Sequence, residues 1–296
     1  MKNLFAWKSP AVAWGALILL ALIWGSSFIL IKRGLTAFSG SEVGALRMVA
    51  AGAFLLPIAV MAFPKLNRRH WGVLLIIGFL GSLIPAFLFA WAQTQLSSSA
   101  TGIINAVTPL NVLVVGALFF HQAIARKQLI GLGIGLVGTV LLILAGSSES
   151  PGQGFNAYTL LVVGATLCYG FSSNIIKFYT RDLTPQTITA VSLVLTLPIS
   201  AGYLFGYSSF LPTLEQHNAW WPFAAIVTLG VVGTALALII FNKLVQVRTP
   251  VFATSVTYLV PMVALLWGFI DGESLNYRHF LGMAAILGGV FIANRL

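Results

Sequence analysis

The chain has 296 residues, of which 58% are hydrophobic and only 7% are charged. Soluble domains carry about 25% charged residues, so this composition excludes a compact water-soluble protein and a disordered chain. The single cysteine, Cys168, excludes a disulfide-stabilised secreted scaffold. The excess of 16 Lys and Arg over 6 Asp and Glu is typical of topology signals beside membrane spans. We therefore expect an integral membrane protein without a nucleic-acid partner.

Ten stretches between charges and turn residues are each apolar enough to form a membrane-spanning helix of about 20 residues. The first follows Lys2 and Lys8, is longer than a signal peptide and lacks a cleavage motif, so we expect it to be retained. The sequence thus predicts an all-α integral membrane protein with ten transmembrane helices. In chain order these are residues 11–31, 42–62, 71–94, 99–119, 127–145, 156–177, 185–206, 220–242, 249–270 and 278–294.

The basic residues predict the orientation of these spans. With the N-terminus inside, the inner segments hold all Lys and Arg residues except four, and five of the six acidic residues lie on the outer side. The four outer basic residues are Lys32, Arg33, Arg47 and Arg278. Since cytoplasmic loops carry the excess of Lys and Arg, we expect both termini in the cytoplasm.

The two halves of the chain carry the same motifs in the same order. Residues of the first span recur 145 positions later, and residues of the third and fourth spans recur 152 positions later. The matched pairs include Trp24 with Tyr169, Ser27 with Ser172, Gly78 with Gly230, Gly81 with Gly233, and Pro109 with Pro261. Because five spans is an odd number, the second half enters the membrane from the opposite side. The sequence therefore predicts two inverted five-helix repeats, residues 1–146 and 147–296, as in many secondary transporters.

Several of these motifs together resemble a known family. They are Trp24-Gly25-Ser26-Ser27-Phe28, Lys32, Arg47, Pro109 and Gly272-Glu273. Over essentially the whole chain they resemble the EamA-type repeats of the drug/metabolite transporter superfamily. The resemblance implies a bacterial inner-membrane carrier that exports amino acids and related metabolites, with aromatic amino-acid exporters as the nearest fit. The first repeat has His121 at the position of Glu273, where the family often has Glu, so a matched acidic pair is not carried over.

Charged residues inside the predicted spans are few. Arg47 lies about one and a half turns into the second span, where it can contact a substrate carboxylate or a coupling anion. A structural alternative is an anchor bonded to Glu42, to carbonyls or to a neighbouring helix. All four histidines lie at span ends or in loops, so strong proton coupling is not indicated.

No enzyme motif is present. The sequence contains no Walker A motif, no metal-ligand cluster and no nucleophile elbow. We therefore expect no catalysis, no metal and no cofactor.

Polar and aromatic residues near helix breaks predict the substrate site, because such side chains are costly where they face lipid. The predicted lining is Trp24, Ser26, Ser27, Ser82, Asn105, Thr108, Tyr169, Ser172, Asn174, Thr234, Thr257 and Tyr258. Two further sets predict hinges. Gly78, Gly81, Gly230 and Gly233 would let the third and eighth spans slide, and Pro109 and Pro261 would bend the fourth and ninth.

These observations predict a monomeric carrier in the lipid bilayer that moves small molecules, namely amino acids including aromatic ones, by alternating access. Two alternatives remain open. A broad drug or nucleotide-type metabolite carrier would favour several basic residues at the midplane, where only Arg47 qualifies. A passive channel would show flux that does not saturate and no counterflow.

Overall fold

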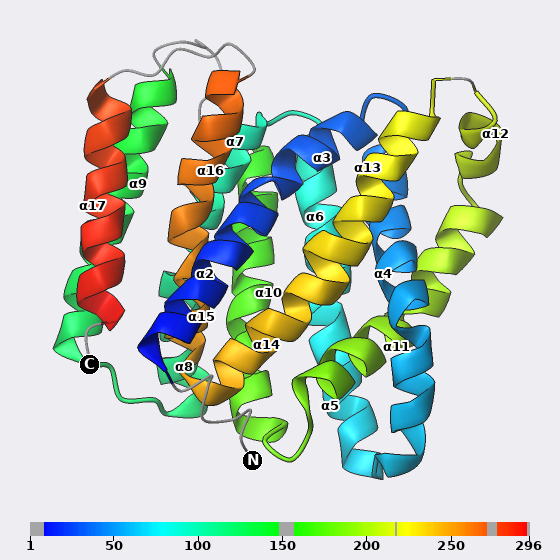
Figure 1. The fold of residues 1–296 in the computed structure, drawn as a ribbon, viewed down its shortest axis with the longest axis horizontal. Helices are drawn as coiled ribbons and strands as arrows, with labels where there is room; N and C mark the ends of the chain where they lie inside the picture. The colour runs from blue at the N-terminus through cyan, green and yellow to red at the C-terminus, as the bar shows by residue number, and fades with distance from the viewer. Residues whose placement is uncertain (1–8, 148–156, 217, 271–276, 295–296) are drawn as a thin grey trace.

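The protein is an all-helical bundle in the computed structural model, which describes residues 9–147, 157–216, 218–270 and 277–294. Within these ranges the secondary structure is helical and no strand occurs. Figure 1 shows the helices standing side by side, with α9 next to α17 at one edge of the bundle. Gly272 and Glu273 lie outside the described residues.

The first half of the chain forms helices that coincide with the first five predicted spans. Ser39 and Glu42 form a capping box that starts α4, and Pro10 opens α2 at a position where its missing N–H costs nothing. The elements are α2 (Pro10–Gly25), α3 (Ser27–Gly34), α4 (Gly40–Ala62), η1 (Phe63–Lys65), α5 (Arg68–Gly78), η2 (Phe79–Leu83), α6 (Ile84–Ala92), α7 (Ser98–Asn105), α8 (Thr108–Phe120) and α9 (Arg126–Ser147).

The second half follows the same order and adds one short helix, α12, that the sequence did not predict. Thr184 caps α11 and Pro185 follows it at the first helical position. The elements are α10 (Ala157–Tyr179), α11 (Pro185–Gly206), α12 (Phe210–Leu214), α13 (Trp220–Gly230), η3 (Val231–Leu236), α14 (Ala237–Val247), α15 (Pro250–Thr254), α16 (Val256–Ile270) and α17 (Tyr277–Asn294).

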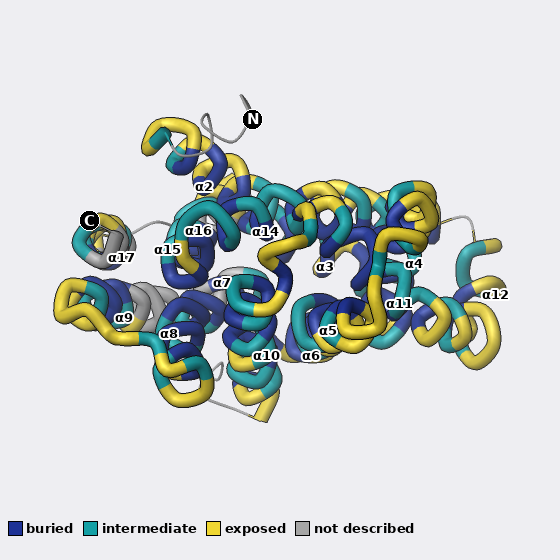
Figure 2. The backbone as a smooth tube through the Cα atoms, turned by 90° about the horizontal axis from the view of Figure 1, so that it is seen from below, coloured by how far each residue is buried: buried dark blue, intermediate teal, exposed yellow. Residues whose placement is uncertain are grey.

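Six helical segments are long and apolar enough to cross a membrane, which makes this a multi-pass membrane protein. They are Pro10–Gly34, Gly40–Lys65, Arg68–Ala92, Ala157–Tyr179, Pro185–Gly206 and Trp220–Val247. Shorter apolar helices occur at Thr108–Phe120, Pro250–Val263 and Phe280–Gly289. Figure 2 shows buried positions on the inward sides of the helices and exposed positions on the outside. Large apolar side chains such as that of Leu118 are among the exposed ones. An apolar exterior is what lipid requires.

Two of the long segments contain a π-helical turn at equivalent positions. The turn η2 covers Phe79–Leu83 and η3 covers Val231–Leu236. Their first residues are 152 positions apart, which is the spacing of the sequence repeat in these spans. A π-helical turn inserts an extra residue into the helix and is frequent at functional sites. Gly81 and Gly233, two of the predicted hinge residues, lie within these turns.

The fourth and ninth predicted spans are interrupted, but at different positions. The first interruption is at residues 106–107, immediately before Thr108 and Pro109 open α8. The second is at Ser255, whereas Pro261 lies inside α16. The prolines were predicted as a matched pair of bends, yet only Pro109 directly follows an interruption. The short α15 ends at Thr254, well before Pro261.

Close helix packing depends on glycine at several contacts. A Cβ added to Gly78 would collide with the backbone oxygen of Ser192 on α11, and one added to Gly230 would lie 2.7 Å from the backbone oxygen of Arg47 on α4. On α17, a Cβ at Gly289 would lie 2.5 Å from the backbone oxygen of Gly131. Small residues at such positions let backbones approach, as is usual for helices packed in lipid.

Candidate functional site

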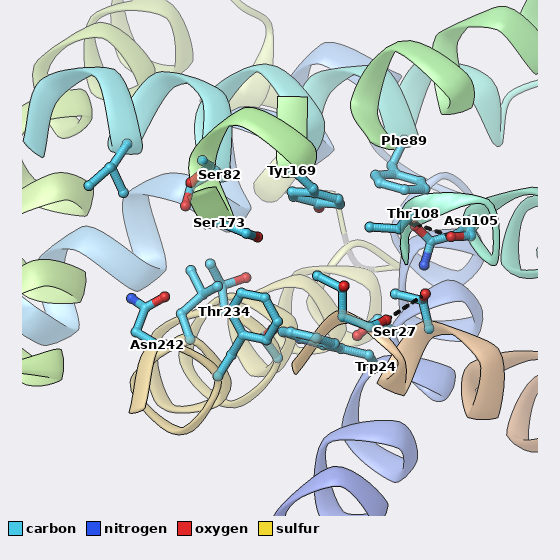
Figure 3. A pocket seen from close by; sticks show the side chains of 18 of the residues that line it. Trp24, Ser27, Ser82, Phe89, Asn105, Thr108, Tyr169, Ser173, Thr234 and Asn242 are labelled. Atoms are coloured by element: carbon cyan, nitrogen blue, oxygen red, sulfur yellow. Dashed lines mark hydrogen bonds between the residues drawn. The ribbon is translucent and has the colours of Figure 1, made fainter. Parts of the chain in front are cut away.

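A cavity lies inside the bundle where the π-helical turns meet α2, α3 and α10. The space between its walls, including the part open to solvent, is about 990 Å³. Its described lining is apolar and aromatic with hydroxyl and amide groups, and Arg47 is the one charged residue among them. Figure 3 shows two groups of side chains facing each other across this space.

We define the tryptophan wall as Trp24, Ser27, Gly233, Thr234 and Phe241. The indole Nε1 of Trp24 donates to the backbone oxygen of Gly233 at 2.9 Å. The ring of Trp24 also packs on Phe241, with 5.3 Å between ring centroids. The π-helical turn η3 presents its Gly233 carbonyl to this indole, which fixes the ring at the edge of the cavity.

We define the tyrosine wall as Tyr169, Ser172, Gly81, Ser82 and Phe89. The rings of Tyr169 and Phe89 stack with 6.1 Å between centroids and an interplanar angle of 25°. The hydroxyl of Ser172 fills the space beside Gly81, where an added Cβ would lie 2.5 Å from its oxygen. Figure 3 shows Tyr169, Phe89 and Ser82 on the side of the cavity opposite Trp24.

Each residue of the tryptophan wall has a counterpart in the tyrosine wall at the spacing seen in the sequence. Trp24 and Ser27 correspond to Tyr169 and Ser172 at 145 positions. Gly81, Ser82 and Phe89 correspond in the same order to Gly233, Thr234 and Phe241, at a spacing of 152 positions. The glycine contacts agree with this pairing, because Gly81 faces Ser172 while Gly233 faces Ser27.

Arg47 enters the cavity from α4 and contacts the tryptophan wall. Its Nε donates to the hydroxyl of Thr234 at 2.7 Å, and that hydroxyl donates to the Leu229 backbone oxygen at 3.1 Å. Within the described residues no ion pair joins Glu42 to Arg47, and the Glu42 carboxylate accepts from the Ser39 backbone N–H at the start of α4. Of the forms that the structural alternative could take, the bond to Glu42 does not occur, whereas the bond to a neighbouring helix does.

The interruption between α7 and α8 contributes polar groups at one side of the cavity. The Thr108 hydroxyl donates to the Asn105 backbone oxygen at 2.6 Å and lies 3.1 Å from the Asn105 side-chain oxygen. This arrangement leaves the amide nitrogen of Asn105 pointing into the cavity in Figure 3. On α16, the Thr257 hydroxyl donates to the Thr254 backbone oxygen at 2.8 Å, and both threonines line the cavity.

Nine of the predicted site residues line this cavity. They are Trp24, Ser27, Ser82, Asn105, Thr108, Tyr169, Ser172, Thr234 and Thr257. Among the predicted hinge residues, Gly81 and Gly233 also line it, whereas Gly78 and Gly230 lie at helix contacts and Pro109 and Pro261 lie outside the lining.

Three predicted lining residues point elsewhere because their side chains serve helix contacts. The Ser26 hydroxyl accepts from the Trp267 indole and donates to the Leu22 backbone oxygen. The amide of Asn174 donates to the Val112 and Gly170 backbone oxygens and accepts from Gln122, which ties α10 to α8. Tyr258 is 1% exposed and packs on α9, where the missing side chain of Gly135 leaves room for its ring.

The predicted lining omits several residues that line the cavity, and helical spacing identifies four of them. Phe28 and Ile31 lie four and seven positions after Trp24, and Ser173 and Ile176 lie four and seven positions after Tyr169. Residues at this spacing share one face of a helix. The remaining missed residues are Ile77, Phe89, Ser192, Leu238, Phe241, Asn242 and Thr254.

A polar network joins helices beyond one end of the cavity. The Lys177 ammonium donates to the backbone oxygens of Gln246 and Arg248, and the Gln246 amide donates to those of Thr180 and Leu183. These bonds tie the end of α10 to the end of α14.

Nearby, His70 at the start of α5 bonds Asp182, in the turn after α10, at 2.8 Å. The hydrogen bond from His70 holds the pKa of the Asp182 carboxyl below its usual value. The Nδ1 of His70 accepts from the Asn67 backbone N–H, so its Nε2 carries the proton donated to Asp182.

Comparison with known families gives a match along nearly the whole chain. The model of the EamA-like transporter family matches it twice, over residues 12–144 and 156–295.

Several curated proteins align with the chain over most of their length. The uncharacterized inner membrane transporter YedA of Escherichia coli strain K12 is 25% identical, over 94% of this chain and 89% of that protein. A probable terminal-alkyne amino-acid exporter of Streptantibioticus cattleyicolor is 24% identical, over 97% of this chain and 95% of that protein. An S-adenosylmethionine/S-adenosylhomocysteine transporter of Chlamydia trachomatis is also 24% identical, over 86% of this chain and 80% of that protein.

A crystal structure supports the same fold. It superimposes with a TM-score of 0.71 at 18% sequence identity and covers 97% of each chain. At this identity the likeness concerns the fold alone.

Proposed function

Since this chain belongs to the EamA-like transporter family, we propose that it is a secondary transporter that exports amino acids, including aromatic ones, and related small metabolites. It carries them across the bacterial inner membrane by alternating access. The observation that carries the proposal is the cavity, whose two aromatic walls are joined by hydroxyl groups, amide groups and one arginine. Such a lining suits a small molecule that has both an apolar side chain and polar ends.

The proposed architecture is ten transmembrane helices in two inverted five-helix repeats, residues 1–146 and 147–296, with both termini in the cytoplasm. The two matches of the family model, the equivalent positions of η2 and η3 and the paired wall residues support the repeat. The distribution of Lys and Arg supports the orientation. The transporter works as a monomer, with the lipid bilayer around it and without nucleic acid.

In this proposal the aromatic rings bind the apolar part of the substrate. Trp24 with Phe241 and Tyr169 with Phe89 form two ring pairs on opposite sides of the cavity. Aromatic pairs in offset or tilted arrangements gain about 0.5–1.5 kcal/mol beyond the burial of their surface, so an aromatic substrate side chain fits between them. The amide nitrogen of Asn105 and the hydroxyl of Ser82 then remain for the polar part, and the Ser27 hydroxyl, which donates to the Ile23 backbone oxygen, can accept from it.

Alternating access requires that helices move past one another, and the glycines on the third and eighth spans allow this. Gly81 and Gly233 lie in π-helical turns against serine side chains, whereas Gly78 and Gly230 lie against backbone. Pro109 and Pro261 have no backbone N–H, so each leaves out one hydrogen bond that would hold the helix straight, and the helix can bend there. If the variants Gly81→Leu and Gly233→Leu retained the wild-type transport rate, the sliding mechanism would be wrong.

The test of function is uptake by the purified protein in proteoliposomes, against a panel of amino acids with and without pH and sodium gradients. We expect saturable flux of aromatic amino acids above that of empty vesicles. The absence of flux for every amino acid would exclude the proposed substrate class. Flux that rises linearly with concentration would indicate a channel instead.

A second candidate substrate is a larger metabolite that contains both a nucleoside and an amino-acid group. The similarity to the S-adenosylmethionine/S-adenosylhomocysteine transporter favours it. S-adenosylmethionine should therefore be included in the panel as a labelled substrate and as a competitor. Uptake of this compound without uptake of phenylalanine would favour the second candidate over the first.

A further inference from the structure

Arg47 is a charged group in the interior of a membrane-spanning segment. It lies within Gly40–Lys65, one of the six long apolar segments, and lines the cavity. A charged side chain at membrane depth is expensive, and such residues usually face a water-filled space or a partner. The question is therefore which partner the guanidinium binds.

The described protein residues provide Arg47 with a single hydrogen-bond acceptor, the Thr234 hydroxyl on its Nε. The carboxylate of Glu42 caps α4 and that of Asp182 bonds His70, so neither neutralises Arg47. Within the described part of the chain, the two terminal Nη groups have no hydrogen-bond acceptor.

Helix packing at this position does not require an arginine. Gly230 packs against the backbone oxygen of Arg47, and its counterpart Gly78 packs against the backbone oxygen of Ser192. The two contacts are equivalent, because both glycines use the backbone of the facing helix and both facing residues line the cavity. A serine therefore suffices on α11 for the same contact, so the guanidinium of Arg47 serves another purpose.

We infer that Arg47 determines specificity for substrates with a carboxylate, which its two Nη groups bind inside the cavity. This inference rests on the proposed function and names the chemical group by which the substrate is recognised. A guanidinium presents a planar pair of donors that matches a carboxylate. Thr234 orients the guanidinium by accepting from Nε, which leaves the Nη groups for the ligand.

The experiment compares phenylalanine with phenylalaninamide, which has the same ring and ammonium group but no carboxylate. Half-saturation concentrations for both are measured in proteoliposomes for the wild type, Arg47→Gln and Arg47→Lys. We expect Arg47→Gln to raise the value for phenylalanine about tenfold or more, because a charge-assisted hydrogen bond is lost. The half-saturation concentration for phenylalaninamide should change less than twofold in Arg47→Gln. For phenylalanine, the half-saturation concentration of Arg47→Lys should lie between those of the wild type and Arg47→Gln.

A matched control is Arg33→Gln, which removes an exposed arginine of α3 outside the cavity lining. It should leave both values unchanged. If Arg47→Gln weakened the acid and the amide equally, the arginine would have a structural role and the inference would be overturned. Absence of all amino-acid flux in the wild type would instead refute the proposed function itself.

Folding and inorganic anions require separate measurements. If Arg47→Gln does not elute as a single species in detergent, the comparison rests on Arg47→Lys, which retains the charge. Replacing chloride with methanesulfonate tests whether the arginine binds an inorganic anion. A dependence on chloride that is present in the wild type and lost in Arg47→Gln would overturn the inference, whereas flux independent of chloride in both would support it.

Discussion

The tryptophan wall and the tyrosine wall of the cavity use the same backbone arrangement with different side chains. In both, a π-helical turn places a glycine against a serine, and an aromatic ring of the first helix packs on a phenylalanine. The walls differ in the ring that faces the cavity. Trp24 donates to the Gly233 carbonyl, while Tyr169 stacks on Phe89.

This difference separates two kinds of constraint. Where backbones touch, both halves have glycine, because a Cβ at either position meets a carbonyl oxygen of the facing helix. Where side chains face the cavity, the halves diverge, and Arg47 in one corresponds to Ser192 in the other. Packing thus keeps the halves alike, and we attribute the divergence to the substrate.

We expect the largest effect from substitutions at the two equivalent glycines that pack against the backbone of a facing helix. Gly78→Leu and Gly230→Leu should each destabilise the protein by about 1–3 kcal/mol or more, because the new side chain has to displace backbone of α11 or α4. Thermal unfolding in detergent measures this effect. Gly15→Leu and Gly202→Leu are matched controls, since nothing lies within 4 Å of a Cβ there. Equal loss in all four variants would contradict the packing argument.

Thr234→Val and Ser82→Ala change equivalent residues of the two walls. Thr234→Val removes the acceptor of Arg47 Nε, which costs about 1–3 kcal/mol when a buried donor loses its partner. We expect the half-saturation concentration for phenylalanine to rise about three- to tenfold, with a smaller change for Ser82→Ala. Similar changes in the two variants would show that the walls bind substrate equally.

Trp24→Phe and Tyr169→Phe compare the two rings. Trp24→Phe loses the hydrogen bond to the Gly233 carbonyl, so we expect a loss of about 0.5–1.5 kcal/mol in thermal unfolding. Tyr169→Phe keeps the stacked ring and should be close to neutral in stability. If Tyr169→Phe were the more destabilising change, the anchoring role given to Trp24 would be wrong.

The smallest expected effect concerns the hydrogen bond between His70 and Asp182, which links the two halves of the chain outside the cavity. Since the bond from His70 lowers the pKa of Asp182, the folded state binds fewer protons there than the unfolded state. Its stabilisation is full at neutral pH and is lost as the pH falls through that lowered pKa, below about 4. Asp182→Asn should cost less than about 1 kcal/mol at pH 7, because the carboxylate is largely exposed.

Thermal unfolding of the wild type and Asp182→Asn at several pH values measures the contribution of Asp182. The two proteins should converge only at acid pH. A difference that stayed constant down to pH 3 would show that the carboxylate charge is not involved.

Much of the fold was predictable because the apolar length of a spanning helix is a strong signal. Every predicted span coincides with a helix or a run of helices within the described residues. The π-helical turns were not predictable, since a single altered turn leaves no periodic pattern. The position of the second interruption was missed because Pro261 is tolerated inside α16, while the break lies at Ser255.

The candidate site was predictable where residue type and helix face agreed. Ser27 and Ser172 lie three positions after Trp24 and Tyr169 and line the cavity. The polarity of Ser26 and Asn174 predicted a place in the lining, but their positions turn both side chains toward neighbouring helices. Apolar lining residues such as Ile31 and Phe89 were missed because an apolar residue in a membrane helix usually faces lipid or core.

We propose that the protein carries an amino acid through this cavity and across the membrane by alternating access. The most direct measurement is counterflow: proteoliposomes loaded with unlabelled phenylalanine are diluted into labelled phenylalanine with all ion gradients collapsed. We predict transient accumulation of label above its external concentration, since a carrier exchanges one substrate molecule for another. Uptake that never exceeds equilibrium, or that equals the uptake of empty vesicles, would contradict the account.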